Sequence, residues 1–311
     1  MNMKTPRLLL IALLGISSTS LAQQPSRPQP PLPDNIEVIR DVEYCRHGDK
    51  PLLLDIYQPK QKPESRMPAV VWIHGGGWSA GSKSGGGASA LLAPRGYVAV
   101  SINYRLSQVA KFPAAIEDCK AAVRWLRANA DRYHIDPDRI GVWGSSAGGH
   151  LSHLVGTSDK TAGLEGNGGN EKFSSRVQAV VSLCGPADLT LDTELLERIP
   201  NNPVVSFLGG TSKERPDAYK KASPIFHVTA DDPPVMMFHG DRDVIVFLKQ
   251  SEVMLKALKD AGVPAELIVV KNADHNFRQV GSNPIEPPQA ELFRRAFEFF
   301  DKHLKKTDAP K

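Results

Sequence analysis

Residues 139–149 of this 311-residue chain read Arg139-Ile140-Gly141-Val142-Trp143-Gly144-Ser145-Ser146-Ala147-Gly148-Gly149. The apolar residues that end at Trp143 predict a buried strand, and a helix-forming segment begins at Ala147. Between them lies the pattern G-x-S-x-G, a strained turn from strand to helix that leaves one serine projecting above a sheet. Ser146 stands centred between the two glycines and is the expected nucleophile, and Ser145 is the rival within the same turn.

Short β-branched runs alternate with longer amphipathic segments on both sides of this turn. We expect strands at 37–44, 52–57, 69–73, 97–104, 139–143, 178–184, 235–239 and 265–271, the first two forming an antiparallel edge. We expect helices at 113–130, from about residue 150, at 247–261 and at 288–305. This order predicts the α/β class, with a mostly parallel sheet that carries helices on both faces, in one large domain.

Two segments do not fit the alternation of strands and helices. Residues 156–175 are rich in glycine and polar residues, and residues 188–223 contain three prolines and a Gly209-Gly210 pair. Open α/β sheets bind their ligands beyond the carboxyl ends of the strands. We therefore interpret both segments as cap or substrate loops.

A glycine run follows the predicted strand 69–73. It reads His74-Gly75-Gly76-Gly77-Trp78, and backbone N–H groups in such a loop can point at a developing oxyanion without reorganising. We expect the donors to be the N–H groups of Gly76, Gly77 and Ala147, the residue after the nucleophile. A flexible glycine turn is the alternative, since Gly85-Gly86-Gly87 forms a second cluster. Trp78 and Ser145 are expected to contact substrate.

A serine nucleophile needs a base and an acid that orients it. His275 is the candidate base, because it follows the predicted strand 265–271 and precedes the last helix. Gly240-Asp241-Arg242-Asp243 follows the strand 235–239, and we prefer Asp243 as the acid because Asp241 is suited to capping the turn. Asp188 is a more distant candidate.

The N-terminus differs in composition from the rest. Residues 1–22 combine Lys4 and Arg7, an apolar run and the small-x-small site Ser20-Leu21-Ala22, which predicts a signal peptide; a retained anchor is the alternative. Residues 23–37 are proline-rich and predict an extended linker. The catalytic domain is expected at 38–306, with a tail at 307–311. We therefore expect an exported protein, periplasmic or extracellular, with no stable membrane insertion after cleavage.

Charge and cysteine content narrow the function further. The net charge is +4 and the basic residues are scattered, so nucleic acid is not an expected partner. Cys45, Cys119 and Cys184 allow one disulfide within the chain at most and leave a thiol over. Cys119 and Cys184 lie in apolar patterns typical of buried core residues. No metal-ligand spacing is found, and we expect neither metal nor cofactor.

Together these residues resemble the α/β-hydrolase superfamily, specifically a bacterial exported esterase/lipase branch similar to acetylxylan and feruloyl esterases and to the hormone-sensitive-lipase group. The resemblance spans about residues 55–304 and is carried by His74-Gly75-Gly76-Gly77-Trp78, Tyr104-Arg105, Asp136-Pro137-Asp138-Arg139-Ile140, Gly144-Ser145-Ser146-Ala147-Gly148-Gly149, Gly240-Asp241-Arg242-Asp243 and Asp274-His275. It implies the α/β-hydrolase fold, Asp243 as the acid, and the second and third glycines of H-G-G-G as donors. Asp274-His275-Asn276-Phe277 departs from the Gly-His-Gly-Phe of many relatives.

The expected function is hydrolysis of a carboxylic ester through an acyl-enzyme. The expected substrate is a small-molecule or polysaccharide-linked ester, with acetyl or feruloyl esters of plant polysaccharide as first candidates. An amidase or formamidase of the kynurenine formamidase type is one alternative, and a non-catalytic binding module of the same fold is another. Acyl length and oligomeric state are left open.

Overall fold

The computed structural model describes residues 32–305, which form one eight-stranded sheet in the order β1-β2-β4-β3-β5-β6-β7-β8. β1 and β2 pair antiparallel, as do β2 and β4, whereas every pairing among β3 to β8 is parallel. The strands are β1 (Ile36–His47), β2 (Lys50–Pro59), β3 (Met67–Ile73), β4 (Val98–Ile102), β5 (Ile135–Ser145), β6 (Ala179–Leu183), β7 (Val235–Gly240) and β8 (Ala265–Val270). The predicted antiparallel edge and parallel remainder are both confirmed.

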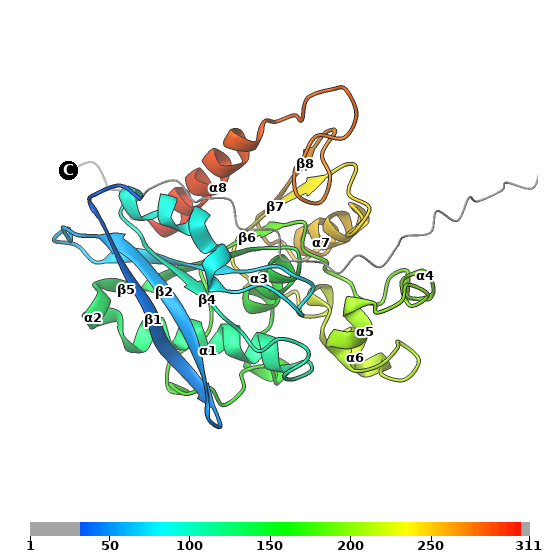
Figure 1. Ribbon diagram of the computed structural model, residues 1–311, viewed down its shortest axis with the longest axis horizontal. Coiled ribbons are helices and arrows are strands. Elements are labelled where there is room, and N and C mark those ends of the chain that lie inside the picture. The colour runs from blue at the N-terminus through cyan, green and yellow to red at the C-terminus, as the bar shows by residue number, and fades with distance from the viewer. Residues whose placement is uncertain (1–31, 306–311) are drawn as a thin grey trace, which may run out of the picture. The chain divides into compact units, whose positions relative to one another are not determined.

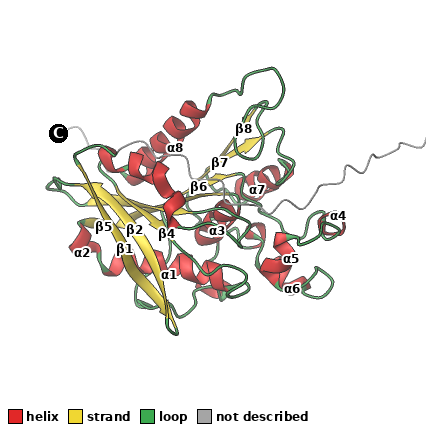
Figure 2. Ribbon diagram, viewed as in Figure 1, coloured by secondary structure: helices red, strands yellow, loops and turns green. Residues whose placement is uncertain are grey.

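Helices cover both faces of the sheet (Figures 1 and 2). One face packs against α1 (Ala114–Ala128), α3 (Ala147–Thr157) and α7 (Lys249–Asp260), and the other against α8 (Gln289–Leu304) and the 3-10 turns η1 (Lys83–Leu91) and η2 (Ala93–Arg95). The remaining helices are short: α2 (Ala130–Tyr133), α4 (Thr193–Leu196), α5 (Pro203–Leu208), α6 (Pro216–Lys221), η3 (Lys160–Ala162) and η4 (Pro224–Phe226).

Burial on two faces explains why the central strands are apolar without alternation. In β3, Val71 and Ile73 belong to the core beneath α1 and α3, while Val70 between them belongs to the core beneath α8. Successive side chains of a strand point to opposite faces, so a strand covered on both sides needs an apolar residue at every position. Trp143 of β5 makes edge contacts with Phe297 and Phe300 of α8 in the same way.

The predicted boundaries differ from the structure near the N-terminus. β1 begins at Ile36, so the last two residues of the expected linker 23–37 lie in a strand. The expected signal peptide, most of the linker and the whole expected tail 307–311 fall outside the described residues. Within 32–305, no helix combines the length and the apolar character needed to cross a bilayer.

The prediction that residues 156–175 form a cap or substrate loop is wrong. α3 starts at the serine turn and carries the chain back along the sheet, so the loop that follows it emerges at the edge opposite the carboxyl ends of the strands. This loop is tied to α1: Lys120 donates to Glu165 Oε1 at 2.7 Å, and Arg124 donates to Glu165 Oε2 at 2.9 Å. None of its residues lines the large cavity described below.

Two histidines are fully buried on α3. His150 accepts a hydrogen bond from the indole N–H of Trp78 and donates to the carbonyl of Ala222. Neither ring nitrogen of His153 finds a partner within residues 32–305. Burial lowers the pKa of His150 to about 4, and burial together with the neighbouring His150 lowers the pKa of His153 to about 3. Both rings are therefore neutral in the folded protein near neutral pH.

These histidines predict a loss of stability in acid. An unfolded imidazole protonates near pH 6.5, so stability present above that pH is lost as the pH falls from about 6.5 towards 4 and 3. The free energy of unfolding should therefore fall between pH 7 and pH 4. His153→Leu removes one of the two groups responsible, so at about 1.4 kcal/mol per pKa unit this fall should be smaller by about 3 kcal/mol in the variant than in the wild type. Urea titrations at both pH values measure this. The same substitution at the surface residue His227 is the control, and an equal drop in both variants would contradict the assignment.

Candidate active site

The serine turn joins β5 to α3 at the carboxyl edge of the sheet. Ser146 has φ 56° and ψ −121°, a conformation that a non-glycine residue adopts only when its surroundings hold it there. A Cβ on Gly148 would lie 2.0 Å from the carbonyl oxygen of Ile73, and one on Gly144 would lie 2.4 Å from the carbonyl oxygen of Gly148. The two flanking glycines are thus required because β3 and the first turn of α3 pass against them.

Ser146, His275 and Asp243 meet at this edge and form a chain of hydrogen bonds. Ser146 Oγ lies 2.9 Å from His275 Nε2, and His275 Nδ1 lies 2.6 Å from Asp243 Oδ2. The three residues follow β5, β8 and β7, whose parallel arrangement places their carboxyl ends at one edge. Two different ring nitrogens serve the two contacts, as transfer of a proton from the hydroxyl to the imidazole requires.

The rival residues Ser145, Asp241 and Asp188 take no part in these hydrogen bonds. The side chain of Ser145 lines the cavity, but His275 bonds to Ser146. Asp241 is exposed and lies 3.8 Å from Arg242. Asp188 accepts hydrogen bonds from the backbone and hydroxyl of Thr190.

Asp243 is held from several sides. Oδ1 accepts the backbone N–H groups of Ile245 and Val246, each at 2.9 Å, and Oδ2 faces His275 and also His239 Nε2 at 3.3 Å. Burial alone would raise the pKa of Asp243, but the hydrogen bonds from His239 and His275 outweigh it and hold the pKa well below its usual range. The carboxylate is therefore ionised whenever the protein is folded near neutral pH.

Two buried residues, His239 and Cys184, lie beside Asp243, and the sequence patterns did not predict these contacts. His239 is fully buried; its Nε2–H donates to the carbonyl of Val246 at 2.7 Å, and its Nδ1 contacts Ser251 Oγ at 2.7 Å. Cys184 is buried with φ 50°, in the left-handed region, beside the same carboxylate. His239 ends a predicted strand, and that position was the available signal; nothing in the sequence distinguished Cys184 from a core residue.

The glycine loop after β3 faces the serine turn. Gly76, Gly77 and Trp78 have φ values of 107°, 57° and 56°, so the loop runs through left-handed conformations. Within residues 32–305, the N–H groups of Gly76, Gly77 and Ala147 form no hydrogen bond with the protein, whereas the carbonyl of Gly76 accepts from Ser79 and Ala80. The three expected donors line one cavity with Ser146.

Gly76→Ala tests this loop. A Cβ at Gly76 would lie 2.3 Å from the carbonyl oxygen of Ala80, so the loop must move and its N–H groups move with it. Loss of one oxyanion donor typically lowers kcat by about 10²- to 10³-fold, and we expect a decrease of that order for an ester substrate. Gly85→Ala, in the second glycine cluster where a Cβ meets no atom within 4 Å, is the matched control. Equal kcat values for both variants would count against the loop's role.

A cavity of about 780 Å³ opens above Ser146 and His275. Residues of the predicted cap segment 188–223 form one wall, and residues 244–247 form another. Trp78 lines the cavity, but its ring is buried, stacks on Phe207 at 4.6 Å and gives its N–H to His150. The contact of Trp78 with substrate stays a prediction, as does that of Ser145.

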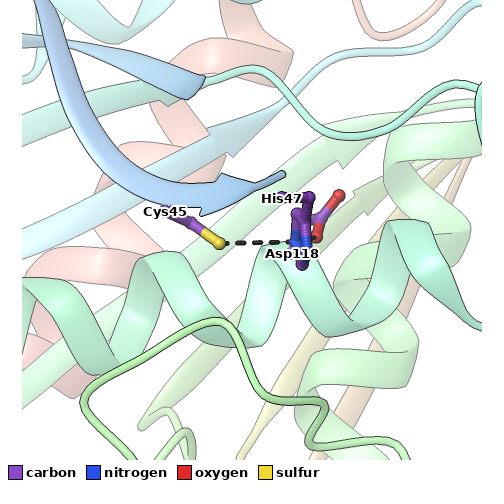
Figure 3. A group of neighbouring side chains, drawn as sticks. All are labelled: Cys45, His47 and Asp118. Atoms are coloured by element: carbon purple, nitrogen blue, oxygen red, sulfur yellow. Dashed lines mark hydrogen bonds and ion pairs between the residues drawn. The ribbon is translucent and has the colours of Figure 1, made fainter. Parts of the chain in front are cut away.

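The cysteines are free thiols and are buried. Cys45 and His47 lie on β1 and face Asp118 of α1, as Figure 3 shows. Cys45 Sγ is 3.4 Å and Asp118 Oδ1 is 2.9 Å from the same atom, His47 Nε2, so the group cannot relay a proton across the imidazole. Arg105 already donates to both oxygens of Asp118, and burial raises the pKa of Cys45 to about 11. We assign this cluster to anchoring β1 on α1.

Comparisons with known proteins identify the family of this chain. The sequence model of the BD-FAE family matches residues 54–258, about two thirds of the chain. The chain belongs to the BD-FAE family. The match begins at β2 and ends in α7, so it contains the glycine loop, the serine turn and Asp243, while His275 follows it. The fold and the family are those of α/β-hydrolase esterases, as the motifs predicted.

Individual relatives are similar over most of the chain. The Mycobacterium tuberculosis protein named Esterase LipC is 34% identical over 268 residues, which cover 82% of this chain and 65% of LipC. A truncated carbohydrate esterase from gut microbiota superposes with a TM-score of 0.74 at 32% identity and covers 87% of this chain and 97% of its own. Est2 of Thermogutta terrifontis, solved with propionate, gives 0.72 at 29% identity, covering 90% and 99%. This chain spans less than two thirds of the length of LipC.

Proposed function

We propose that this protein hydrolyses carboxylic esters through an acyl-enzyme on Ser146. The observation that carries the proposal is the pair of contacts Ser146 Oγ to His275 Nε2 and His275 Nδ1 to Asp243 Oδ2. A hydroxyl, an imidazole and an ionised carboxylate in this order are the groups that acyl transfer needs. The resemblance of the whole domain to named esterases supports the same reaction.

The reaction proceeds in two halves. His275 Nε2 takes the proton of Ser146 as Oγ attacks the ester carbonyl carbon, and the N–H groups of Gly76, Gly77 and Ala147 stabilise the oxyanion. The bond to the alcohol oxygen then breaks, and His275 returns the proton to the leaving alcohol. Water attacks the acyl-enzyme with His275 again as base, the acid departs, and Ser146 regains its proton.

Covalent labelling tests this proposal directly. A fluorophosphonate adds a phosphonyl group to an activated serine hydroxyl with loss of fluoride, so we expect a single adduct on the peptide that contains Ser146. Peptide mass spectrometry locates the adduct, and prior incubation with an ester substrate should slow its formation. A protein that stays unlabelled while Ser146 remains accessible would favour the non-catalytic binding module.

For the substrate, we propose acetyl or feruloyl esters of plant polysaccharide, which the enzyme would hydrolyse after export. The similarity to a carbohydrate esterase from gut microbiota supports the polysaccharide, and the signal-peptide pattern of residues 1–22 supports export. Release of acetate or ferulate from acylated xylan measures this activity. Rates on matched acyl esters and anilides separate an esterase from an amidase, and a higher kcat/KM on the anilide would replace our proposal by the amide reaction.

A further inference from the structure

Most of the cavity above Ser146 lies beyond the reacting atoms. Pockets that hold drug-sized ligands enclose roughly 300–1,000 Å³, and the 780 Å³ found here falls within that range. An acetyl group needs only a small part of this space. The walls that surround the remainder should therefore select the substrate.

Apolar side chains are exposed at the mouth of this cavity. Val244, Ile245, Ile199 and Phe247, which we call the apolar rim, retain 79%, 63%, 52% and 38% of their accessible surface. Among the side chains of residues 32–305 whose burial is described, which leaves out 87, 88, 195 and 196, nine large hydrophobic ones are exposed, and these four all line the one cavity. Clustered exposed apolar residues around a concave site mark a surface that is covered when a ligand binds.

The rim is built from two segments that are held in place independently. Val244, Ile245 and Phe247 follow Asp243, whose carboxylate fixes the turn through the N–H groups of Ile245 and Val246. Ile199 belongs to the cap segment 188–223, where Asn202 caps α5 by accepting from Val204 and Val205. Because these hydrogen bonds already hold the backbone of both segments, a ligand that binds there loses little free energy to ordering them.

Two polar side chains of the cavity wall, Gln250 and Asp188, are engaged within the protein. Gln250 accepts from the N–H groups of Ala187 and Asp188 and donates to the carbonyl of Asp188, and Asp188 itself accepts from Thr190. The apolar rim itself offers no polar side chain to the hydroxyl groups of a sugar, whereas an apolar group needs only the surface that the rim provides.

We propose that the apolar rim binds an alkyl or aromatic group of the ester, larger than acetyl, and sets the preference for such esters. The inference rests on the proposed ester hydrolysis and names which part of the chain selects the substrate. Ile199, Val244, Ile245 and Phe247 are specificity-determining residues and take no part in proton transfer.

The test compares ratios of kcat/KM, so that any general change in activity cancels. One ratio is p-nitrophenyl octanoate over p-nitrophenyl acetate, in which the acyl group varies; the other is phenyl acetate over methyl acetate, in which the alcohol varies. The double variant Val244→Ser with Ile245→Ser should lower one of these ratios about tenfold, the discrimination typical of a few buried methylene groups. The ratio that falls identifies the part of the ester on the rim.

Two further variants keep the result open to refutation. Ile199 lies away from the turn after Asp243, and Ile199→Ser should lower the same ratio. A ratio that falls only in the double variant would instead indicate that the two substitutions disturbed the turn. Leu91→Ser, an exposed apolar residue outside the cavity, is the control. Unshifted ratios in an active enzyme, or equal shifts in the control, overturn the inference alone. A wild-type protein that cleaves no ester overturns the proposed function and the inference with it.

Discussion

Ser146→Ala should lower kcat for a p-nitrophenyl ester by three orders of magnitude or more. Removal of Oγ leaves His275 Nε2 without its 2.9 Å partner and abolishes the acyl-enzyme, so only the oxyanion donors and substrate binding contribute to the rate. Steady-state kinetics with active-site titration of the wild type measure the effect. KM should change far less than kcat, because the hydroxyl contributes to bond making and little to binding.

Ser145→Ala is the matched control for this variant. It alters the adjacent hydroxyl in the same turn, and the structure gives that hydroxyl no contact with His275. We expect Ser145→Ala to remain within about tenfold of the wild type. Near-native turnover by Ser146→Ala, with loss of turnover by Ser145→Ala, would reassign the nucleophile.

Asp243→Asn should lower kcat by about 10²- to 10⁴-fold without unfolding the protein. An amide can still accept the N–H groups of Ile245 and Val246, but its NH₂ would face His275 Nδ1, whose N–H points at the carboxylate in the wild type, and would lie near His239 Nε2. His275 is then driven to the tautomer that cannot accept the proton of Ser146. Kinetics together with a thermal melt measure the two effects separately.

Asp241→Asn distinguishes the two aspartates of the Gly240-Asp241-Arg242-Asp243 turn. Asp241 is exposed and makes no contact with His275, so its amide variant should keep most of the wild-type kcat. If Asp241→Asn were the inactive variant and Asp243→Asn the active one, the orientation of His275 would have to come from another group.

The sequence predicted the fold well because the informative residues are buried on both sides. All eight strands and the four long helices lie where the apolar patterns placed them, within a few residues at each end. The two-residue error at Ile36 arose because five prolines between Gln23 and Asp34 hid the start of an edge strand, which needs no apolar run. The short helices α4, α5 and α6 escaped prediction because a helix of one or two turns has no periodicity to detect.

The sequence predicted which residues form the catalytic site, but it predicted little about the residues that surround them. Motif order named Ser146 and His275, since each follows a parallel strand and such strands end at one edge. It left Asp241 and Asp243 as acids, and the choice of Asp243 depended on the turn-capping argument and on the family resemblance. Residues 156–175 were misassigned because they were grouped with loops that leave a strand, although they follow a helix: α3 carries the chain back to the opposite edge of the sheet. The His239 contact with Asp243 depends on how a buried ring is turned, which no pattern of residue types encodes.

The turn after Asp243 has a consequence for engineering this enzyme. Its peptide groups anchor the acid while its side chains form the mouth of the cavity. Random libraries at positions 244, 245 and 247 can therefore explore new selectivity at little risk to turnover, provided that proline is omitted at 245, where it would delete a donor to Asp243. Within these four residues the side chains are free to change, whereas the backbone must stay as it is to hold Asp243 in place.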